Sequence, residues 1–194
     1  MSSRGVWFDT SRPSPFRSPP LSTSSLSRST PPSAGFSQGV SFVLVTDEAC
    51  RQEVAQIAGE EQYTSSTLAP MHPFISEAPA QIVICTSEKI YKDRYREPDK
   101  AGDDGEQPEW PTPYWHTDAG CALMLILLAA VDQGLAGAFV GVWDKDGLRS
   151  LLGIPEHFHP IGIALLGHGD TDVKSPSLKR GRRPLGEVLH YEHW

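Results

Sequence analysis

The chain has 194 residues, of which 17 are Lys or Arg and 24 are Asp or Glu, so its formal net charge at pH 7 is −7. This length predicts one domain with a sizeable core, and the acidic balance gives no reason to expect nucleic acid or a membrane surface as a partner. Three widely spaced cysteines, Cys50, Cys85 and Cys121, lie in apolar stretches without a C-x-x-C spacing, which predicts buried free thiols in the reducing cytoplasm. The longest apolar run, 121–131, is too short to span a bilayer, and no apolar signal region opens the chain.

Residues 1–31 differ in composition from the rest of the chain. They are rich in Ser, Pro and Arg, contain Asp9 as their one acidic residue, and show no apolar period of 2 or 3.6 residues. Such a segment buries too little apolar surface to offset the entropy lost on ordering it. We therefore predict a disordered segment over 1–31 and a folded domain over 32–194.

A loop of small and polar residues, Pro32-Ser33-Ala34-Gly35-Phe36-Ser37-Gln38-Gly39, comes directly before the first strand candidate. Glycine lets a backbone approach another group closely, and Ser33 and Gln38 offer a hydroxyl and an amide to the polar edge of a ring. These residues alone leave two interpretations open. The loop is either a tight turn that enters the strand or a surface for a planar polar ligand.

Alternating strand and helix patterns follow from residue 40 onward. The expected strands are 40–46, 81–86, 136–143 and 160–166, and the expected helices are 48–58, 88–96, 119–133 and a short one from Asp146 to Gly153. Asp47, Asp118 and Asp146 are the predicted N-caps. The strand 40–46 is expected to be buried, and the helix 119–133 is apolar almost all round, which predicts complete burial. The pattern as a whole predicts an α+β fold, with a mixed or antiparallel sheet around a buried central helix.

The segments between these elements carry the remaining candidates. A Pro-containing connector spans 64–78, and 97–113 is a polar loop of the length of a lid. The aromatic residues around His116 either pack in the core or form one wall of a substrate pocket, with His116 as a weak candidate proton donor. The histidine pairs at 157–159 and 190–193 have no Cys or carboxylate at ligand spacing, so we predict no metal site.

Three ordered motifs together resemble the FMN-dependent nitroreductase family. They are the loop P-S-A-G-F-S-Q-G, the helix D-A-G-C-A-L-M-L-I-L-L-A-A-V-D-Q-G-L over 118–135, and the end R-G-R-R-P-L-G-E-V-L-H-Y-E-H-W over 180–194. The resemblance covers about 31–194 and implies the nitroreductase-like fold. It also implies a homodimer that binds FMN at the subunit interface. Such enzymes pass a hydride or two electrons from NAD(P)H, or from a deazaflavin in some branches, to nitroaromatics, quinones or free flavins.

The resemblance also implies roles for individual residues. Pro32, Ser33, Ala34 and Gln38 would line the isoalloxazine ring, Val140 and Gly141 would run near it, and Arg180 and Arg182 would meet the FMN phosphate. Guanidinium groups suit a phosphate dianion, and a bound flavin would carry out the redox step itself. Without the resemblance, the basic cluster 179–183 is equally well interpreted as a solvated tail. Phe36 stands where the family commonly has Asn, and Val40 where it commonly has an aromatic residue.

The family's opening helix, with its R-R-x-V-R motif, is missing from 1–31, and the genetic code offers an explanation. Read one nucleotide earlier, the codons for Arg4–Ser11 allow the peptide Arg-Arg-Met-Val-Arg-His-Phe. Its Val is the only possible residue there, because the last base of the Trp7 codon and the first two bases of the Phe8 codon form GTT. We therefore hypothesise a shifted reading frame that is restored shortly before Pro31; an organelle transit peptide and native divergence are the alternatives. A chain that lacks the arginines of this helix would retain FMN poorly, so a flavin-binding or defective paralogue without turnover is the alternative function.

Overall fold

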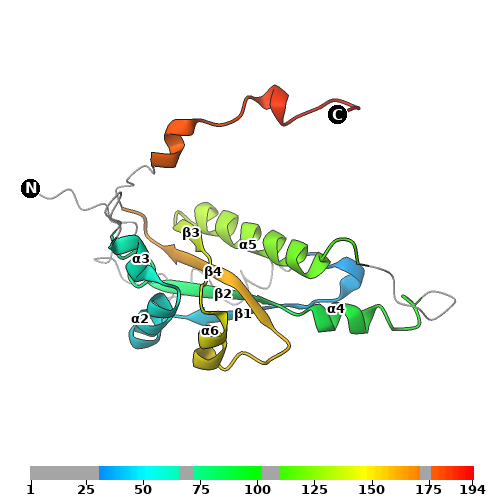
Figure 1. The fold of residues 1–194 in the computed structure, drawn as a ribbon, viewed down its shortest axis with the longest axis horizontal. Coiled ribbons are helices and arrows are strands. Elements are labelled where there is room, and N and C mark those ends of the chain that lie inside the picture. Colours follow the sequence, from blue (N-terminus) through cyan, green and yellow to red (C-terminus); the bar gives the residue numbers. More distant parts are fainter. Residues whose placement is uncertain (1–30, 66–71, 102–109, 171–175) are drawn as a thin grey trace, which may run out of the picture.

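The computed structural model describes residues 31–65, 72–101, 110–170 and 176–194. Four strands, each antiparallel to its neighbours, form one sheet in the order β1-β2-β4-β3 (Figure 1). Their bounds are β1 (Val40–Val45), β2 (Ala80–Thr86), β3 (Ala136–Val140) and β4 (His159–Gly167). The predicted α+β class is confirmed, and the sheet is antiparallel throughout. Most expectations for 1–31, and parts of those for 64–78 and 97–113, lie outside the described residues.

Helices cover both faces of this sheet. The α-helices are α2 (Glu48–Ile57), α3 (Glu60–Thr64), α4 (Glu88–Arg94), α5 (Tyr114–Asp132) and α6 (Lys145–Leu152). Short 3₁₀ turns are η1 (Ala34–Phe36), η2 (Pro176–Arg180) and η3 (Leu185–Glu187). Helix α5 crosses one face, and α2 and α6 lie on the other (Figure 1).

The central strand β2 shows how the two cores form. All seven of its residues are buried because it lies between two strands and between two layers of helices. Ile82 and Ile84 pack in one cluster with Ile126 of α5. Val83 points to the opposite face and packs in a second cluster with Leu148 of α6. The alternation of side chains along a strand thus supplies one apolar row to each core.

Helix α5 is buried on one side only. Ala119, Ala122, Ile126 and Ala130 face the sheet, whereas Met124, Leu128 and Val131 are 52%, 59% and 66% exposed. The expectation of complete burial is therefore wrong for the single chain, because no element of the described chain covers the second side. The helix is long and apolar enough to cross a membrane, yet its sheet-facing side packs as the core helix of a globular domain does.

Strand β1 also differs from its predicted burial. It lies at an edge of the sheet, so Phe42 and Leu44 are exposed, while Val43 and Val45 contribute to the core on the α2 side. The cysteines differ as well: all three are free, but only Cys85 is buried, and Cys121 on α5 is exposed. Both differences arise because burial depends on which elements lie on either side, and local composition does not specify them.

The predicted caps give a mixed result. Asp47 caps α2, since its Oδ1 accepts a hydrogen bond from the Cys50 N–H at 2.9 Å. Helix α6 is capped by Asp144 instead of Asp146, because Asp144 Oδ1 accepts from the Gly147 N–H at 2.8 Å. Helix α5 begins at Tyr114 after Pro113, so Asp118 lies inside the helix. Gly153, with a φ of 63°, ends α6 as predicted.

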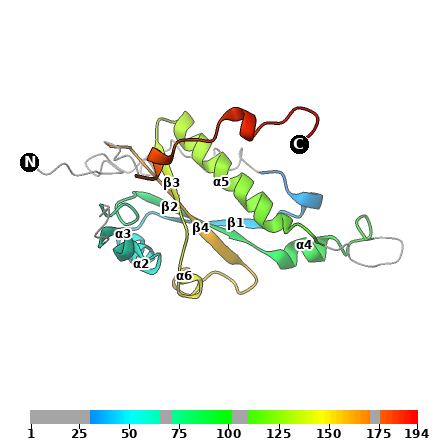
Figure 2. The same ribbon diagram turned by 45° about the horizontal axis from the view of Figure 1, so that its top comes forward.

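The C-terminal segment 176–194 extends away from the sheet on the side of α5 (Figures 1 and 2). From residue 178 onward every residue of this segment is exposed. Six of its large apolar side chains are exposed to solvent: Leu178, Leu185, Val188, Leu189, Tyr191 and Trp194. A segment with this much uncovered apolar surface has the character of a contact surface for another molecule.

Candidate functional site

The loop that precedes β1 has an unusual backbone. The Phe36 N–H donates to the Ser33 carbonyl at 2.9 Å, and the Ser37 N–H donates to the Ala34 carbonyl at 3.1 Å, so two tight turns follow each other. Gly35, Phe36 and Gln38 have φ values of 61°, 58° and 55°. Positive φ is easy for glycine but strained for Phe and Gln, and such strain gathers at functional sites.

Side chains on and around the loop hold this conformation. Ser37 Oγ donates to the Ala34 carbonyl at 2.6 Å, and Ser33 Oγ accepts from the Gln38 N–H at 2.9 Å. From α4, Arg94 Nε donates to the Gly35 carbonyl at 3.0 Å. Hydrogen bonds from several directions therefore determine the backbone of the loop more completely than its own turn would.

Asp118 anchors the loop to the central helix. This carboxylate is buried, and its Oδ2 accepts from the Ala34 N–H at 2.9 Å and from the Tyr91 hydroxyl at 2.7 Å. Tyr91 on α4 is fully buried, and its burial, together with the hydrogen bond to the carboxylate, raises the pKa of its hydroxyl. One acid thus ties together three segments that are far apart in the sequence: the loop, α4 and α5.

Two glycines allow Tyr91 of α4 and Tyr95, which directly follows this helix, to pack on the loop. A Cβ at Gly39 would lie 2.8 Å from Tyr91 Cδ2 and still nearer to Cε2. A Cβ at Gly35 would lie 2.6 Å from Tyr95 Cε2. Neither position has room for a side chain, so the glycine content of the loop reflects close packing in addition to its turn geometry.

Arg94 couples the loop to the segment after α4. Besides its bond to the Gly35 carbonyl, its guanidinium makes hydrogen bonds to Asp99 at 2.6 and 2.7 Å and to Glu97 at 2.9 Å. The hydrogen bond to Arg94 holds the pKa of the Asp99 carboxyl well below its usual range. Arg94, Phe36 and Gln38 also lie along one surface groove.

The structure brings together only some of the predicted cofactor residues. Pro32, Ser33, Ala34 and Gln38 all belong to the loop, and Pro32 and Gln38 are exposed. Val140 is buried at the end of β3, and Gly141 after it is exposed. Since β1 and β3 are opposite edges of the sheet, three strand spacings separate them, about 14 Å.

Arg180 and Arg182 lie in the extended C-terminal segment, and both are exposed. The η2 turn, which ends at Arg180, lies near the β3 end of α5, whereas η1 of the loop lies near the opposite end of this helix (Figures 1 and 2). Within one chain, the loop, the end of β3 and the two arginines therefore form three separate groups.

The aromatic stretch before α5 divides into packed and exposed members. Trp110 lies against Tyr95 and Trp115, with ring centroids 4.7 and 5.7 Å apart, and Trp115 is buried. His116 is exposed on the first turn of α5, 6.1 Å from the Trp115 ring. Packing accounts for the two tryptophans, while His116 is free to face a ligand.

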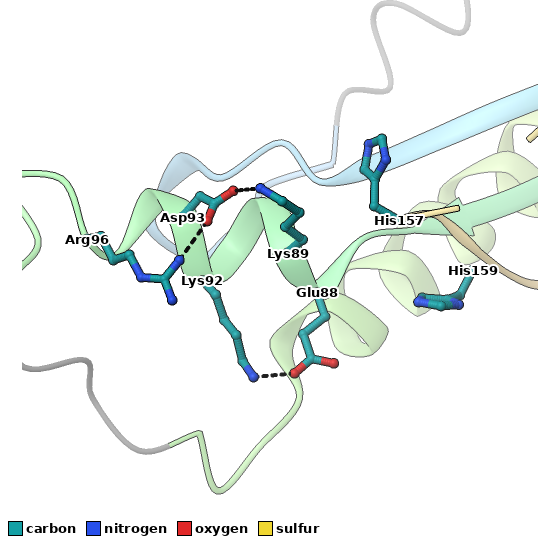
Figure 3. A pocket seen from close by; sticks show the side chains of 7 residues that line it. All are labelled: Glu88, Lys89, Lys92, Asp93, Arg96, His157 and His159. Carbon is teal, nitrogen blue, oxygen red and sulfur yellow. Dashed lines mark hydrogen bonds and ion pairs between the residues drawn. The ribbon is translucent and has the colours of Figure 1, made fainter. Parts of the chain in front are cut away.

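A pocket lined by charged residues and histidines lies beside α4 (Figure 3). His157 and His159 lie on one side of it, and the charged side chains of α4 lie on the other. These charges largely neutralise each other, since Asp93 pairs with Lys89 and with Arg96, and Lys92 pairs with Glu88. Nowhere in the described part of the chain do three His, Cys, Asp or Glu side chains gather in a way that could hold a metal ion.

Sequence reasoning missed the roles of Asp118, Tyr91 and Arg94. Asp118 occurs in the motif D-A-G at the start of an apolar run, which is also the pattern of a helix cap. The signal that could have distinguished the two is Pro113, which stands directly before the helix start at Tyr114 and five residues before Asp118. Tyr91 and Arg94 carry no local signal for these roles, because the bonds to Asp118 and to the Gly35 carbonyl join residues that are far apart in the sequence.

Comparison with known proteins identifies the family. Residues 23–168 match the model of the Nitroreductase family. A curated relative, the NADPH-flavin oxidoreductase of Vibrio harveyi, is 32% identical over 165 residues, which is 81% of this chain and 58% of the relative, so the alignment spans a little over half of that protein.

Solved structures agree in fold. A nitroreductase family protein from Streptococcus pneumoniae TIGR4 has a TM-score of 0.68 at 21% identity, with 99% of this chain and 96% of that chain covered. The NADPH:FMN oxidoreductase of Vibrio harveyi complexed with NAD⁺ has a TM-score of 0.63 at 23% identity, with 100% and 74% covered. These structures share the fold, and the family match over residues 23–168 shows that the chain belongs to the nitroreductase family of oxidoreductases.

Proposed function

We propose that this protein is an FMN-dependent oxidoreductase of the cytoplasm. It would transfer a hydride or two electrons from NAD(P)H, or from a deazaflavin, to a nitroaromatic, a quinone or a similar acceptor. The observation that carries the proposal is the loop 33–38, whose strained backbone is held by Asp118 and Arg94 with no evident structural need for the strain. The named activity of the Vibrio harveyi relative supports the choice of reaction class.

The chemistry of the donor set fits FMN. Ser33 and Gln38 offer hydroxyl and amide groups on the loop, which suit the polar edge of a flavin ring. Arg180 and Arg182 offer guanidinium groups, which suit a phosphate. When bound, FMN supplies the two-electron chemistry, and the residues of this chain bind it, orient it and shield it from water. The Ala34 N–H is already committed to Asp118, so Ala34 would contribute a flat backbone surface, not a donor.

We further propose that two copies of the chain assemble the site. The groups expected to hold the ring and the phosphate are separate within one chain, so a single copy does not surround one molecule of FMN. The exposed side of α5, with Met124, Leu128 and Val131, and the apolar C-terminal segment supply uncovered surface that a homodimer would bury. In this arrangement the loop of one copy and the arginines of its partner would meet at one site.

A flavin-binding protein without turnover is the second candidate. The position of Arg180 and Arg182 favours it, since both are exposed on the C-terminal segment, and a weakly held phosphate would leave the flavin less well positioned for turnover. Phosphate binding that depends on a loosely attached segment would be weak, because ordering the segment costs conformational entropy.

The test is the visible spectrum of the purified protein with added FMN, followed by NAD(P)H oxidation with a quinone or a nitroaromatic compound. Bound flavin with acceptor-dependent oxidation supports the enzyme. Bound flavin without oxidation by either nicotinamide or a reduced deazaflavin supports the second candidate. A protein that binds no FMN at high micromolar concentration contradicts both, and the molecular mass in solution tests the dimer separately.

A further inference from the structure

Phe36 combines two unfavourable features. Its backbone φ of 58° lies in the left-handed region, where a bulky side chain is a genuine outlier. Its side chain is also 73% exposed, so the ring gains almost no burial within the chain. Gly35 and Phe36 are the two central residues of a turn closed by the Ser37 N–H and the Ala34 carbonyl, and both have positive φ. Turns of this kind favour Gly, Asn or Asp at both positions.

The surrounding contacts maintain the conformation but do not compensate for the ring. Asp118 binds the Ala34 N–H, Arg94 binds the Gly35 carbonyl, and Ser37 Oγ binds the Ala34 carbonyl. All three act on the backbone or on neighbouring residues, and none requires an aromatic residue at position 36. A smaller residue that tolerates positive φ would allow the same hydrogen bonds with less strain. We therefore infer that the Phe36 ring makes a contact outside the chain.

We propose that Phe36 is a specificity residue whose ring contacts the planar aromatic acceptor. The proposal rests on the proposed function and names the part of the loop that selects the acceptor. Phe36 lies at a surface groove that Ser37, Gln38, Ile90 and Arg94 also line. A planar acceptor that lies against the flavin-facing loop would meet the Phe36 ring in an offset or edge-on arrangement, as aromatic pairs prefer.

This role predicts opposite effects on stability and on specificity. Phe36→Asn relieves the strained backbone, because Asn tolerates the left-handed region, and it removes the ring. With FMN held at saturation, we expect the midpoint of thermal unfolding to rise by about 2–4 °C. The kcat/KM for a nitroaromatic acceptor, relative to that for ferricyanide, should fall by about 2- to 10-fold, since ferricyanide has no aromatic ring to stack.

Two matched variants separate the ring from the strain. Phe36→Leu removes the ring but keeps a bulky side chain at positive φ, so it should lower the same ratio without raising the melting midpoint. Phe36→Tyr keeps the ring and should preserve both the ratio and the midpoint. The readout on stability does not depend on turnover, and the ratio of acceptors cancels any change in flavin loading.

Three results would overturn the inference. In the first, the acceptor ratio of Phe36→Asn equals that of the wild type while ferricyanide reduction proceeds normally. In the second, Phe36→Asn lowers the melting midpoint and the fraction of dimer, which assigns the ring to the contact between two copies. If the wild-type protein reduces neither acceptor, the proposed function fails as well, and that outcome is distinguished by the missing ferricyanide reaction.

Discussion

Removing the Asp118 carboxylate should destabilise the protein strongly, because this group anchors the loop 32–39 to α5. In Asp118→Ala, the Tyr91 hydroxyl loses its acceptor in a buried setting, and the Ala34 N–H loses its acceptor in a partly buried one. A buried polar group that is left without a partner costs about 1–3 kcal/mol, so the two together predict a loss of about 2–6 kcal/mol. That is a large share of the stability of an ordinary domain.

Companion variants divide this loss between its two bonds. Tyr91→Phe removes one donor while Asp118 keeps the Ala34 N–H, so we expect a loss of about 1.5–3 kcal/mol, the usual range for a hydrogen bond to a charged group. In Asp118→Asn the oxygen can still accept from one donor, which predicts an intermediate loss. A double variant of Asp118→Ala and Tyr91→Phe should lose less than the sum of the two single losses, because both remove the same bond.

The measurement is urea-induced unfolding of the flavin-free protein, followed by circular dichroism. Asp132→Ala serves as the control: it removes an exposed acid from the last turn of the same helix and should change the free energy of unfolding by less than about 0.5 kcal/mol. Asp118 is not the anchor described above if Asp118→Ala loses no more than this control, or if the losses in the double variant are simply additive.

Four further predictions can be checked independently. Gly39→Ala forces a Cβ into the Tyr91 ring and should lower the free energy of unfolding by about 1–3 kcal/mol in the same assay. Gly120→Ala has open space at its Cβ and should stabilise α5 by about 0.5–1 kcal/mol. Equal effects of the two substitutions would contradict the packing of Tyr91 on Gly39. Removing Arg180 and Arg182 together should weaken FMN binding by at least about 10-fold in a fluorescence titration while leaving the circular dichroism unchanged; undiminished affinity would exclude them from the phosphate site. Burial raises the pKa of the Cys85 thiol from 9.0 to about 11, so above about pH 9 the unfolded chain loses this proton while the folded chain keeps it. The free energy of unfolding should therefore fall between about pH 9 and 11. Unfolding curves of a Cys85→Ala variant over the same pH range should show a smaller decrease. The coding DNA for residues 4–31 should spell an R-R-x-V-R-like helix one nucleotide earlier, and a stop codon or an unrelated peptide in that frame would end the hypothesis.

Local signals were enough for most of the elements. The strands at 81–86 and 160–166 and the helix from Glu48 were predicted to within one or two residues, because β-branched runs, an Asp cap and a following glycine are contained within short windows. The strand expected at 136–143 ends at Val140, three residues earlier, since only the first five residues pair with β4. Strand ends are set by partners, which a local window does not contain.

Burial was predicted less well than the elements themselves. The apolar composition of α5 correctly indicated a core helix, but composition could not reveal that its Leu128 side is uncovered in one chain. In the same way, the residues of β1 look like those of a buried strand, although the sheet order leaves Phe42 at an edge. Both depend on the layers on either side, and the contacts that make those layers join distant parts of the chain.

The sequence by itself determined the fold class and the family, and it predicted the loop 32–39 as the ligand site, because each rests on motifs of consecutive residues. Only the tertiary structure decided how that loop is held. Asp118 lies 84 residues from Ala34, and Arg94 lies 59 residues from Gly35, so neither bond has a local pattern. The positive φ of Phe36 is equally invisible in the sequence, since it persists only because these distant partners fix the backbone around it.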